Sequence, residues 1–231
     1  MKIHIKNGRL IDPKQGVDTV QDIFISKGKI IAIGTAPNEF QPSRVIDAES
    51  LIVCPGLVDL SVRLREPGLE YKATLESEME AAVAGGVTSF ACPPDTDPPL
   101  DEPGLVEMLK HRAKNLNRAH VYPIGALTQG LRGERLTEMA ELNDAGCVVF
   151  GQPDGLLPNL RVLMQAMRYA STFGFSVWLR PQEISLTNDG VAHDGEVATR
   201  LGLPTVPVCA ETIAISNIIL LAKETGVRVH L

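Results

Sequence analysis

The sequence predicts an α/β protein in which a parallel sheet follows a small β-rich region. Residues 1–53 consist of short apolar runs separated by tight-turn signals. From Pro55 onward, strand-like apolar segments alternate with longer helix-like segments. Glycine ends several of the helix-like segments, where it can adopt the left-handed conformation of a C-cap. Because alternating strands and helices form parallel βα units, these observations together indicate an α/β architecture.

Residues 1–53 predict a small N-terminal domain of β-sandwich type, since short strands joined by tight turns favour that arrangement. The turn signals are Asn7-Gly8, Asp12-Pro13, Lys27-Gly28 and Gly34. A sheet of about 50 residues is marginal by itself. We therefore expect this domain to be supported by the second predicted domain, residues 54–231.

Six strands are expected in the second domain, and five helices between them. The strand-like segments are Leu57–Leu60, Val87–Ala91, Ala119–Ala126, Cys147–Phe150, Phe175–Leu179 and Val227–Leu231. The helix-like segments are Ala73–Ala84, Pro103–Asn115, Glu134–Ala145, Asn159–Phe173 and Val206–Thr225. On this pattern alone, an open doubly wound sheet and a barrel both remain possible.

Composition excludes several classes of function. The chain has 231 residues, is 44% hydrophobic and carries a net charge of −6, which gives no reason to expect nucleic acid or an anionic membrane as a partner. No window approaches ~18 consecutive apolar residues, and the N-terminus lacks the apolar core of a signal peptide. Four cysteines stand far apart and form no C-x-x-C pair. They predict buried, reduced thiols of a cytoplasmic protein.

Residues 51–68, LIVCPGLVDLSVRLREPG, carry the strongest local signal for a site. An apolar strand ends at Leu60, and apolar and polar residues alternate after it. Alternation in an extended chain would place Ser61, Arg63 and Arg65 on one face. Because active sites of parallel α/β proteins lie at the carboxyl ends of strands, these three side chains predict a polar site there.

The same stretch carries a resemblance to a known family. Residues 55–60, PGLVDL, followed by residues 64–68, LREPG, resemble the first barrel strand of the dihydroorotases of the amidohydrolase superfamily. Residues 195–204, GEVATRLGLP, are also similar to that family. The resemblance implies a TIM-type (β/α) barrel that is incomplete here, with about six of eight strands, so that we expect the chain to be a fragment or a truncated product. Such a barrel should be unstable unless its missing part is supplied.

The resemblance also implies where a catalytic zinc would bind, and this chain departs from the family there. Ser61 and Arg63 stand where the family has a His-x-His pair of zinc ligands, and Arg180 stands at the histidine ligand of strand five. A guanidinium keeps its proton near neutral pH, so each arginine places a fixed positive charge where a cation would bind. We therefore predict no metal cofactor in this chain, although active members of the family use zinc.

Two further residues near the implied metal site leave alternatives open. Asp154, in the stretch 150–155, FGQPDG, is either a displaced form of the family's metal-binding aspartate or a residue of a Pro-Asp-Gly turn, and the turn is favoured. His230 falls near the strand-six position, where a structural role is favoured over a ligand role.

The implied substrate pocket is altered as well. In the family, the arginine of the LREPG motif holds the substrate carboxylate, and Arg65 occupies that position. The family's second carboxylate contact is an asparagine, and here it is Asp95. Because Asp95 is anionic, it would repel a carboxylate. We expect it to pair instead with Arg63 or Arg65, and Glu66 is a second possible partner for Arg65.

These departures favour a non-catalytic, dihydroorotase-like protein of pyrimidine biosynthesis. The resemblance implies that such a protein associates with aspartate transcarbamoylase, or with itself, and supports assembly. The alternative is an active zinc-dependent dihydroorotase, or a related cyclic amidohydrolase, that hydrolyses dihydroorotate to carbamoyl-aspartate. A third possibility is a sensor in which Arg63, Arg65 and Arg180 bind an anion without hydrolysis.

Overall fold

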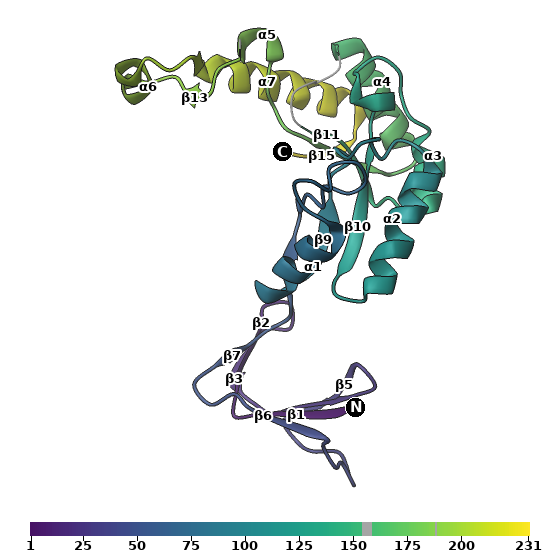
Figure 1. Cartoon of the computed structure of the whole chain (residues 1–231), viewed down its shortest axis with the longest axis vertical. Coiled ribbons are helices and arrows are strands. Elements are labelled where there is room, and N and C mark those ends of the chain that lie inside the picture. Colours follow the sequence, from purple (N-terminus) through teal and green to yellow (C-terminus); the bar gives the residue numbers. More distant parts are fainter. Residues whose placement is uncertain (154–158, 188) are drawn as a thin grey trace. The chain divides into compact units, whose positions relative to one another are not determined.

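The computed structural model describes residues 1–153, 159–187 and 189–231. The chain divides into two compact units, Met1–Gly56 and Leu57–Leu231. Figure 1 shows the β-rich first unit and the α/β second unit. No helix in the described ranges combines the length and the apolarity needed to cross a bilayer.

The first unit contains two small sheets. The four-stranded sheet has the order β5–β4–β1–β6, with bounds Lys29–Ile33, Ile23–Ser26, Lys2–Lys6 and Arg44–Asp47. The three-stranded sheet has the order β3–β2–β7, with bounds Val17–Val20, Arg9–Asp12 and Ile52–Val53. Lys27 and Gly28 connect β4 to β5 and both have positive φ, 50° and 74°, which is the backbone of a tight hairpin turn. The predicted turn at this position is therefore confirmed.

An aromatic cluster lies in the four-stranded sheet. The buried ring of Phe24 stacks on His4 at 4.6 Å and meets Phe40 edge-on at 5.3 Å. His4 Nε2 lies 2.8 Å from Asp22 Oδ2. Because that carboxylate also accepts a hydrogen bond from the Asn7 amide, its pKa is held below the usual value. His4 thus has a structural partner in the residue that precedes β4.

The second unit is built on one parallel sheet of six described strands. In sequence order these are β8 (Leu57–Asp59), β9 (Val87–Cys92), β10 (His120–Ala126), β11 (Val149–Gln152), β12 (Ser176–Leu179) and β15 (Arg228–His230). Each strand pairs with the next one in the sequence, and the spatial order never reverses. A doubly wound sheet requires such a reversal. The arrangement is therefore that of a curved barrel wall.

Helices follow the strands as expected for βα units. The longer ones are α1 (Leu75–Ala84), α2 (Pro103–Leu116), α3 (Met139–Ala145), α4 (Leu160–Thr172) and α7 (Val208–Thr225). A short excursion separates β12 from α7 and contains α5 (Ile184–Thr187), β13 (Ala192–His193), α6 (Glu196–Leu201) and β14 (Thr205–Val206). A single 3-10 turn, η1 (Gln129–Leu131), follows β10.

The start of α3 differs from the prediction. A helix was expected from Glu134, but it begins at Met139. Leu136 instead forms an isolated β-bridge with Thr128, and the hydroxyl of Thr137 donates to the carbonyl of Ala126 at 2.6 Å. Backbone and side-chain bonds to β10 thus compete successfully with helix formation, as Thr residues commonly allow.

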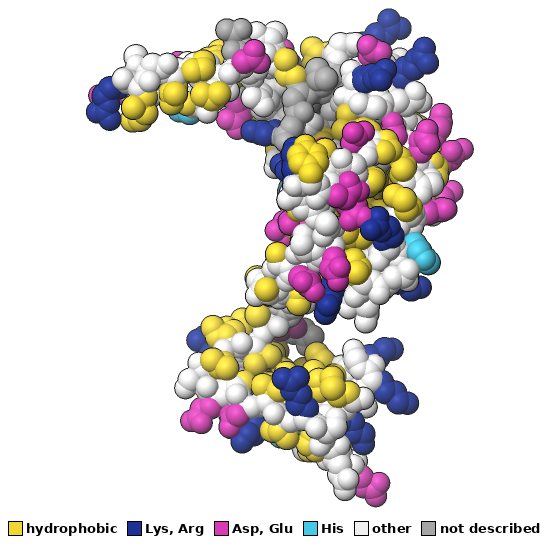
Figure 2. Space-filling view, in the orientation of Figure 1, with side chains coloured by type: hydrophobic (Ala, Val, Ile, Leu, Met, Phe, Trp, Pro, Cys, Tyr) yellow, Lys and Arg dark blue, Asp and Glu magenta, His cyan; other side chains and the backbone are white. Residues whose placement is uncertain are grey.

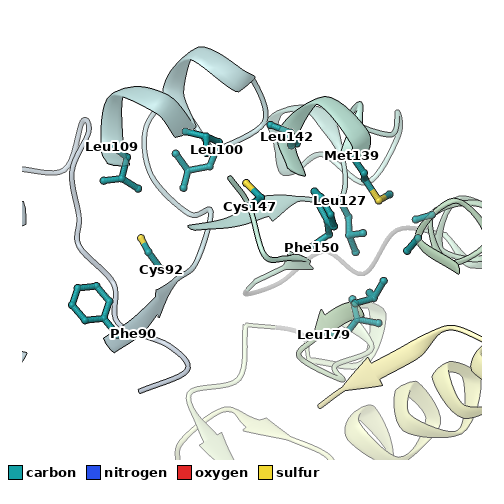
Figure 3. Close-up of a cluster of buried hydrophobic side chains, with 14 of the residues drawn as sticks. Phe90, Cys92, Leu100, Leu109, Leu127, Met139, Leu142, Cys147, Phe150 and Leu179 are labelled. Carbon is teal, nitrogen blue, oxygen red and sulfur yellow. The ribbon is translucent and has the colours of Figure 1, made fainter. Parts of the chain in front are cut away.

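The main core lies between the sheet and its helices, as Figure 3 shows. Phe90 and Phe150 are fully buried on this side of the strands. Their neighbours Ala91 and Val149 belong to a second, smaller cluster that also includes Ile124. Because successive side chains of a strand point to opposite faces, the second cluster marks the face of the sheet away from the main core.

Candidate functional site

A cavity of about 360 Å³ lies at the carboxyl ends of the strands. Its walls come from the segments that end β8, β9, β11, β12 and β15, together with Ile124 of β10. The residues that line it are Leu60, Ser61, Arg63, Pro93, Pro94, Ile124, Gly151, Gln152, Pro153, Trp178, Leu179, Arg180, Pro181, His230 and Leu231. The cavity lies where the sequence predicted a site, because in a parallel sheet these ends share one edge.

The segment after β8 brings Ser61 and Arg63 into this cavity, but by a different path from the one predicted. The strand ends at Asp59, whose carboxylate accepts a hydrogen bond from the Ser61 amide at 2.9 Å. The Val62 amide then donates to the carbonyl of Ala91. Arg65 has φ of 60°, so the chain turns there and the expected alternation does not continue. Arg65 does not line the cavity with the other two residues.

Asp95 joins the two arginines of this segment. Arg63 Nε donates to Asp95 Oδ2 at 2.7 Å, and Arg65 Nη1 lies 3.7 Å from the same oxygen. All three side chains are about one-fifth to one-third exposed. The predicted pairing of Asp95 with Arg63 or Arg65 is thus confirmed. One internal carboxylate, which does not line the cavity, is thus shared by the two guanidinium groups.

Glu66 is held separately from this cluster. Its carboxylate is almost completely buried and accepts a hydrogen bond of 2.8 Å from the amide of Leu75, at the start of α1. It also forms an ion pair with Arg112 of α2. A carboxylate at a helix N-terminus is favoured by the unpaired amides and by the helix dipole. Arg65 therefore takes Asp95 as its described partner, and Glu66 anchors the loop to two helices.

The loop after β8 and the loop after β9 are locked together by their backbones. The Asp97 amide donates to the carbonyl of Pro67 at 3.0 Å. Gly68 has φ of +87°, and a Cβ atom placed on it would lie 1.9 Å from the carbonyl oxygen of Asp97. Only glycine permits this approach. The close contact holds Arg65 and Asp95 on neighbouring, fixed loops.

Arg180, in the segment after β12, also lines the cavity, so that arginines from two strand ends contribute to its walls. Trp178 lines the cavity two residues earlier, and its ring lies 4.8 Å from the ring of His230. Asp154 lies outside the described residues.

Sequence reasoning missed Gln152 and Trp178. Gln152 is 3% exposed, accepts a hydrogen bond from the Thr128 hydroxyl at 3.0 Å and donates to the carbonyl of Leu131 at 2.8 Å. The amide of Gly133 donates in turn to Thr128 Oγ1. This polar cluster fixes the loop after β10 to the end of β11. The available signal was a polar residue at the end of an apolar strand, since buried polar groups need partners.

The residues at this site do not fit a zinc ion. Zinc is held by thiolate, imidazole or carboxylate groups, whereas a guanidinium offers no lone pair to a metal near neutral pH. Within residues 1–153, 159–187 and 189–231, no group of three His, Cys, Asp or Glu side chains is placed to hold a metal ion. Arg63 and Arg180 therefore leave the described site without the donor set that zinc requires.

Two of the four cysteines are buried near the main core. Burial raises the pKa of the Cys92 thiol to about 12 and that of Cys147 to about 12, because a thiolate is poorly solvated there. Cys54 and Cys209 are exposed, so the prediction that all four thiols are buried is wrong for these two. Since the thiolate is the reactive form, neither buried cysteine is suited to act as a nucleophile.

Alkylation of the native protein at about pH 8 is expected to modify Cys54 and Cys209 and to spare the two buried thiols. Mass analysis after proteolysis measures this directly, with urea-unfolded protein as the control in which all four cysteines react. Rapid modification of Cys92 in the folded protein would contradict the prediction.

The two buried thiols also contribute to the free energy of unfolding, and this contribution is complete below the ordinary thiol pKa of about 8.5. That contribution is lost as the pH rises toward about 12, because only the unfolded chain ionises freely in that window. Denaturant unfolding measured between about pH 8 and pH 12 checks this loss, and a free energy of unfolding that does not fall over that range would contradict it.

The fold is shared with solved structures of hydantoinases. L-Hydantoinase (dihydropyrimidinase) from Arthrobacter aurescens matches with a TM-score of 0.79 and 23% identity, over 98% of this chain and 51% of that chain. D-Hydantoinase (dihydropyrimidinase) from a Thermus species matches with a TM-score of 0.68 and 20% identity, over 99% of this chain and 52% of that chain. At these identities the likeness establishes the fold.

A family model described as dihydro-orotase-like matches residues 50–231, and the chain belongs to this family. A "dihydroorotase-like protein" of Pseudomonas putida is 48% identical over 230 residues, and one of Pseudomonas aeruginosa is 46% identical. A "dihydroorotase" of Syntrophotalea carbinolica is 40% identical. Each match covers 100% of this chain and 54% of the relative, so the chain spans about half the length of these curated relatives.

Proposed function

We propose that this chain is a non-catalytic dihydroorotase-like protein of pyrimidine biosynthesis that acts in the cytoplasm as an assembly partner of aspartate transcarbamoylase. The observation that carries the proposal is the ion pair between Arg63 and Asp95, with 2.7 Å between Nε and Oδ2. It stands at the strand ends, where the hydrolases of this family hold zinc and substrate. The two most identical relatives named above are called dihydroorotase-like, which is consistent with this role.

The fixed positive charges support the loss of catalysis more strongly than the missing zinc ligands do by themselves. A dication about 5 Å from one guanidinium is opposed by roughly 7 kcal/mol at an effective dielectric constant of about 20. Arg63 and Arg180 both line the cavity. Ion pairing reduces this opposition without supplying a metal ligand. Restoring the first two family ligands, as in Ser61→His with Arg63→His, leaves Arg180 and Asp95 in place and should not restore turnover.

The finer form of the fold belongs to the same proposal. We infer that the six parallel strands are part of an eight-stranded amidohydrolase barrel whose remaining units lie in the additional length seen in the relatives. The edge strand β8 supports this, since Leu57 and Val58 are 55% and 66% exposed. An apolar edge of this kind is suited to pair with further strands. The 231-residue chain alone should therefore bind a hydrophobic dye strongly.

A second candidate function is small-molecule binding without hydrolysis. The cavity volume of about 360 Å³ lies within the range of ligand pockets, and apolar walls around a few polar groups are typical of such sites. Trp178 is the single tryptophan of the chain and lines this cavity. Its fluorescence therefore reports directly on any ligand that enters.

The proposed function is tested by measuring the metal content, the hydrolysis of dihydroorotate and the co-purification with aspartate transcarbamoylase on the same full-length protein. We expect substoichiometric zinc, no chelator-sensitive turnover and a stable complex with the transcarbamoylase. Stoichiometric zinc that is lost together with turnover on chelation would instead establish the active hydrolase. A ligand-dependent change in Trp178 fluorescence without turnover would favour the binding function.

A further inference from the structure

A groove of about 580 Å³ lies at the amino ends of the strands, where α2 ends and β10 begins. We call it the α2–β10 groove. The residues that line it are Lys110, His111, Ala113, Lys114, Asn117, Arg118, Ala119, His120, Val121 and Tyr122. Because it is at the amino ends of the strands, it is separate from the cavity at their carboxyl ends.

The α2–β10 groove has an unusual charge for this protein. Lys110, Lys114 and Arg118 line it together with two histidines, and none of the described residues in its walls is Asp or Glu. The whole chain has a net charge of −6. Figure 2 shows separate Lys or Arg side chains and a His side chain over α2, with Asp and Glu side chains nearby. Lys114 lies in the last turn of α2 and Lys110 reaches the last residue of α3, so helix C-termini account for these two cations, whereas Arg118 lies beyond both helices.

The cations of the groove keep capacity for further partners. Lys110 Nζ donates to the carbonyl of Ala145 at 3.2 Å, which uses one of the three donors of an ammonium group. Arg118 Nη2 donates to Glu80 Oε1 at 3.0 Å, and both side chains are about half exposed. Such a surface pair is weak and can be exchanged. It also shows that a carboxylate is readily accepted at this end of the groove.

The spacing of the two lysines fits an extended segment. Lys110 and Lys114 are one helical turn apart, which is about 6 Å along the helix axis. Alternate side chains of an extended chain repeat every ~6.8 Å on one face. We propose that the α2–β10 groove binds an extended segment of a partner protein with acidic residues at alternate positions. The identity of this partner as aspartate transcarbamoylase rests on the proposed function, but the acidic chemistry does not.

The experiment compares the full chain with two charge-reversed variants. In the groove variant, Lys110→Glu and Lys114→Glu are combined. In the matched control, Lys14→Glu and Lys72→Glu make the same change of net charge at exposed lysines elsewhere. The probe is a fluorescent peptide of alternating Glu and Ser, measured by anisotropy at low and at high salt. Circular dichroism verifies that both variants remain folded.

We expect the peptide to bind the unaltered chain and the control, to bind the groove variant at least about tenfold more weakly, and to dissociate at high salt. Absence of binding to the unaltered chain, or equal binding by both variants, overturns the groove proposal. Co-purification separates the two proposals. If the groove variant still forms a complex with the transcarbamoylase, the transcarbamoylase is not the partner that binds the groove, and the scaffold role stands. If neither the unaltered chain nor any variant forms that complex, the scaffold role is overturned, and the peptide measurement alone decides the groove proposal.

Discussion

Replacement of Gly68 by alanine is expected to lower the free energy of unfolding of the second unit by about 3 kcal/mol or more. The new Cβ atom would lie 1.9 Å from the Asp97 carbonyl oxygen, and that neighbour is backbone, which cannot rotate away. The φ of +87° adds a conformational cost of roughly 1 kcal/mol for any residue with a side chain. The two loops that carry Arg65 and Asp95 must then separate, so the ion-pair cluster is lost together with the stability.

Urea unfolding followed by the fluorescence of Trp178 measures this effect within the second unit. Gly174→Ala is the matched control, because Gly174 has a similar φ of +73° and nothing within 4 Å of the added Cβ atom. We expect the control to cost about 1 kcal/mol, which isolates the conformational term from the collision. Equal losses in the two variants would show that the loops do not approach as closely as the structure indicates.

Replacement of Asp95 by asparagine is expected to create affinity for dihydroorotate where the unaltered chain has little. In our proposal, the carboxylate of Asp95 pairs with the guanidinium groups of Arg63 and Arg65 and repels an incoming carboxylate. Removing one negative charge about 5 Å from a bound anion is worth roughly 3 kcal/mol at an effective dielectric constant of about 20. That figure corresponds to about a hundredfold tighter binding, and partial exposure of the cluster reduces it to about thirtyfold.

Titration of dihydroorotate against Trp178 fluorescence measures the binding, since this tryptophan lines the cavity. Asp97→Asn is the control. It removes a charge from the same loop at an exposed side chain that forms no described ion pair with either arginine. We expect the control to behave as the unaltered chain does. If Asp95→Asn also leaves the fluorescence unchanged at millimolar ligand, the cavity is closed to this class of anion for a reason other than the charge of Asp95.

The sequence predicted the βα order of the second unit because short apolar runs alternate with longer helix-like segments, several of which end at glycine. Those local patterns are decided within a few residues. The prediction failed at Glu134, where bonds from Leu136 and Thr137 to the region of β10 replace the first turns of a helix. It also misplaced Arg65, because the left-handed turn there depends on the neighbouring loop and not on strand alternation.

The candidate site shows the same division. Asp95 could be proposed in advance as a partner of either Arg63 or Arg65, because these residues follow strand ends and carry opposite charges. Gln152 could not be assigned a role, since its partners are Thr128 and the Leu131 carbonyl, more than twenty residues away. Contacts of that kind are set by the register between neighbouring strands.

By itself the sequence determined the α/β class, the order of the strands along the chain and the presence of fixed cations at the strand ends. Residue type and short-range periodicity are sufficient for each of these. Only the tertiary structure decided which strands are neighbours, that Glu66 belongs to Arg112 and that one carboxylate is shared by Arg63 and Arg65. The physical reason is that ion pairs and cavities depend on distances between segments far apart in the chain, and these distances follow from how the sheet curves and how its loops lock together.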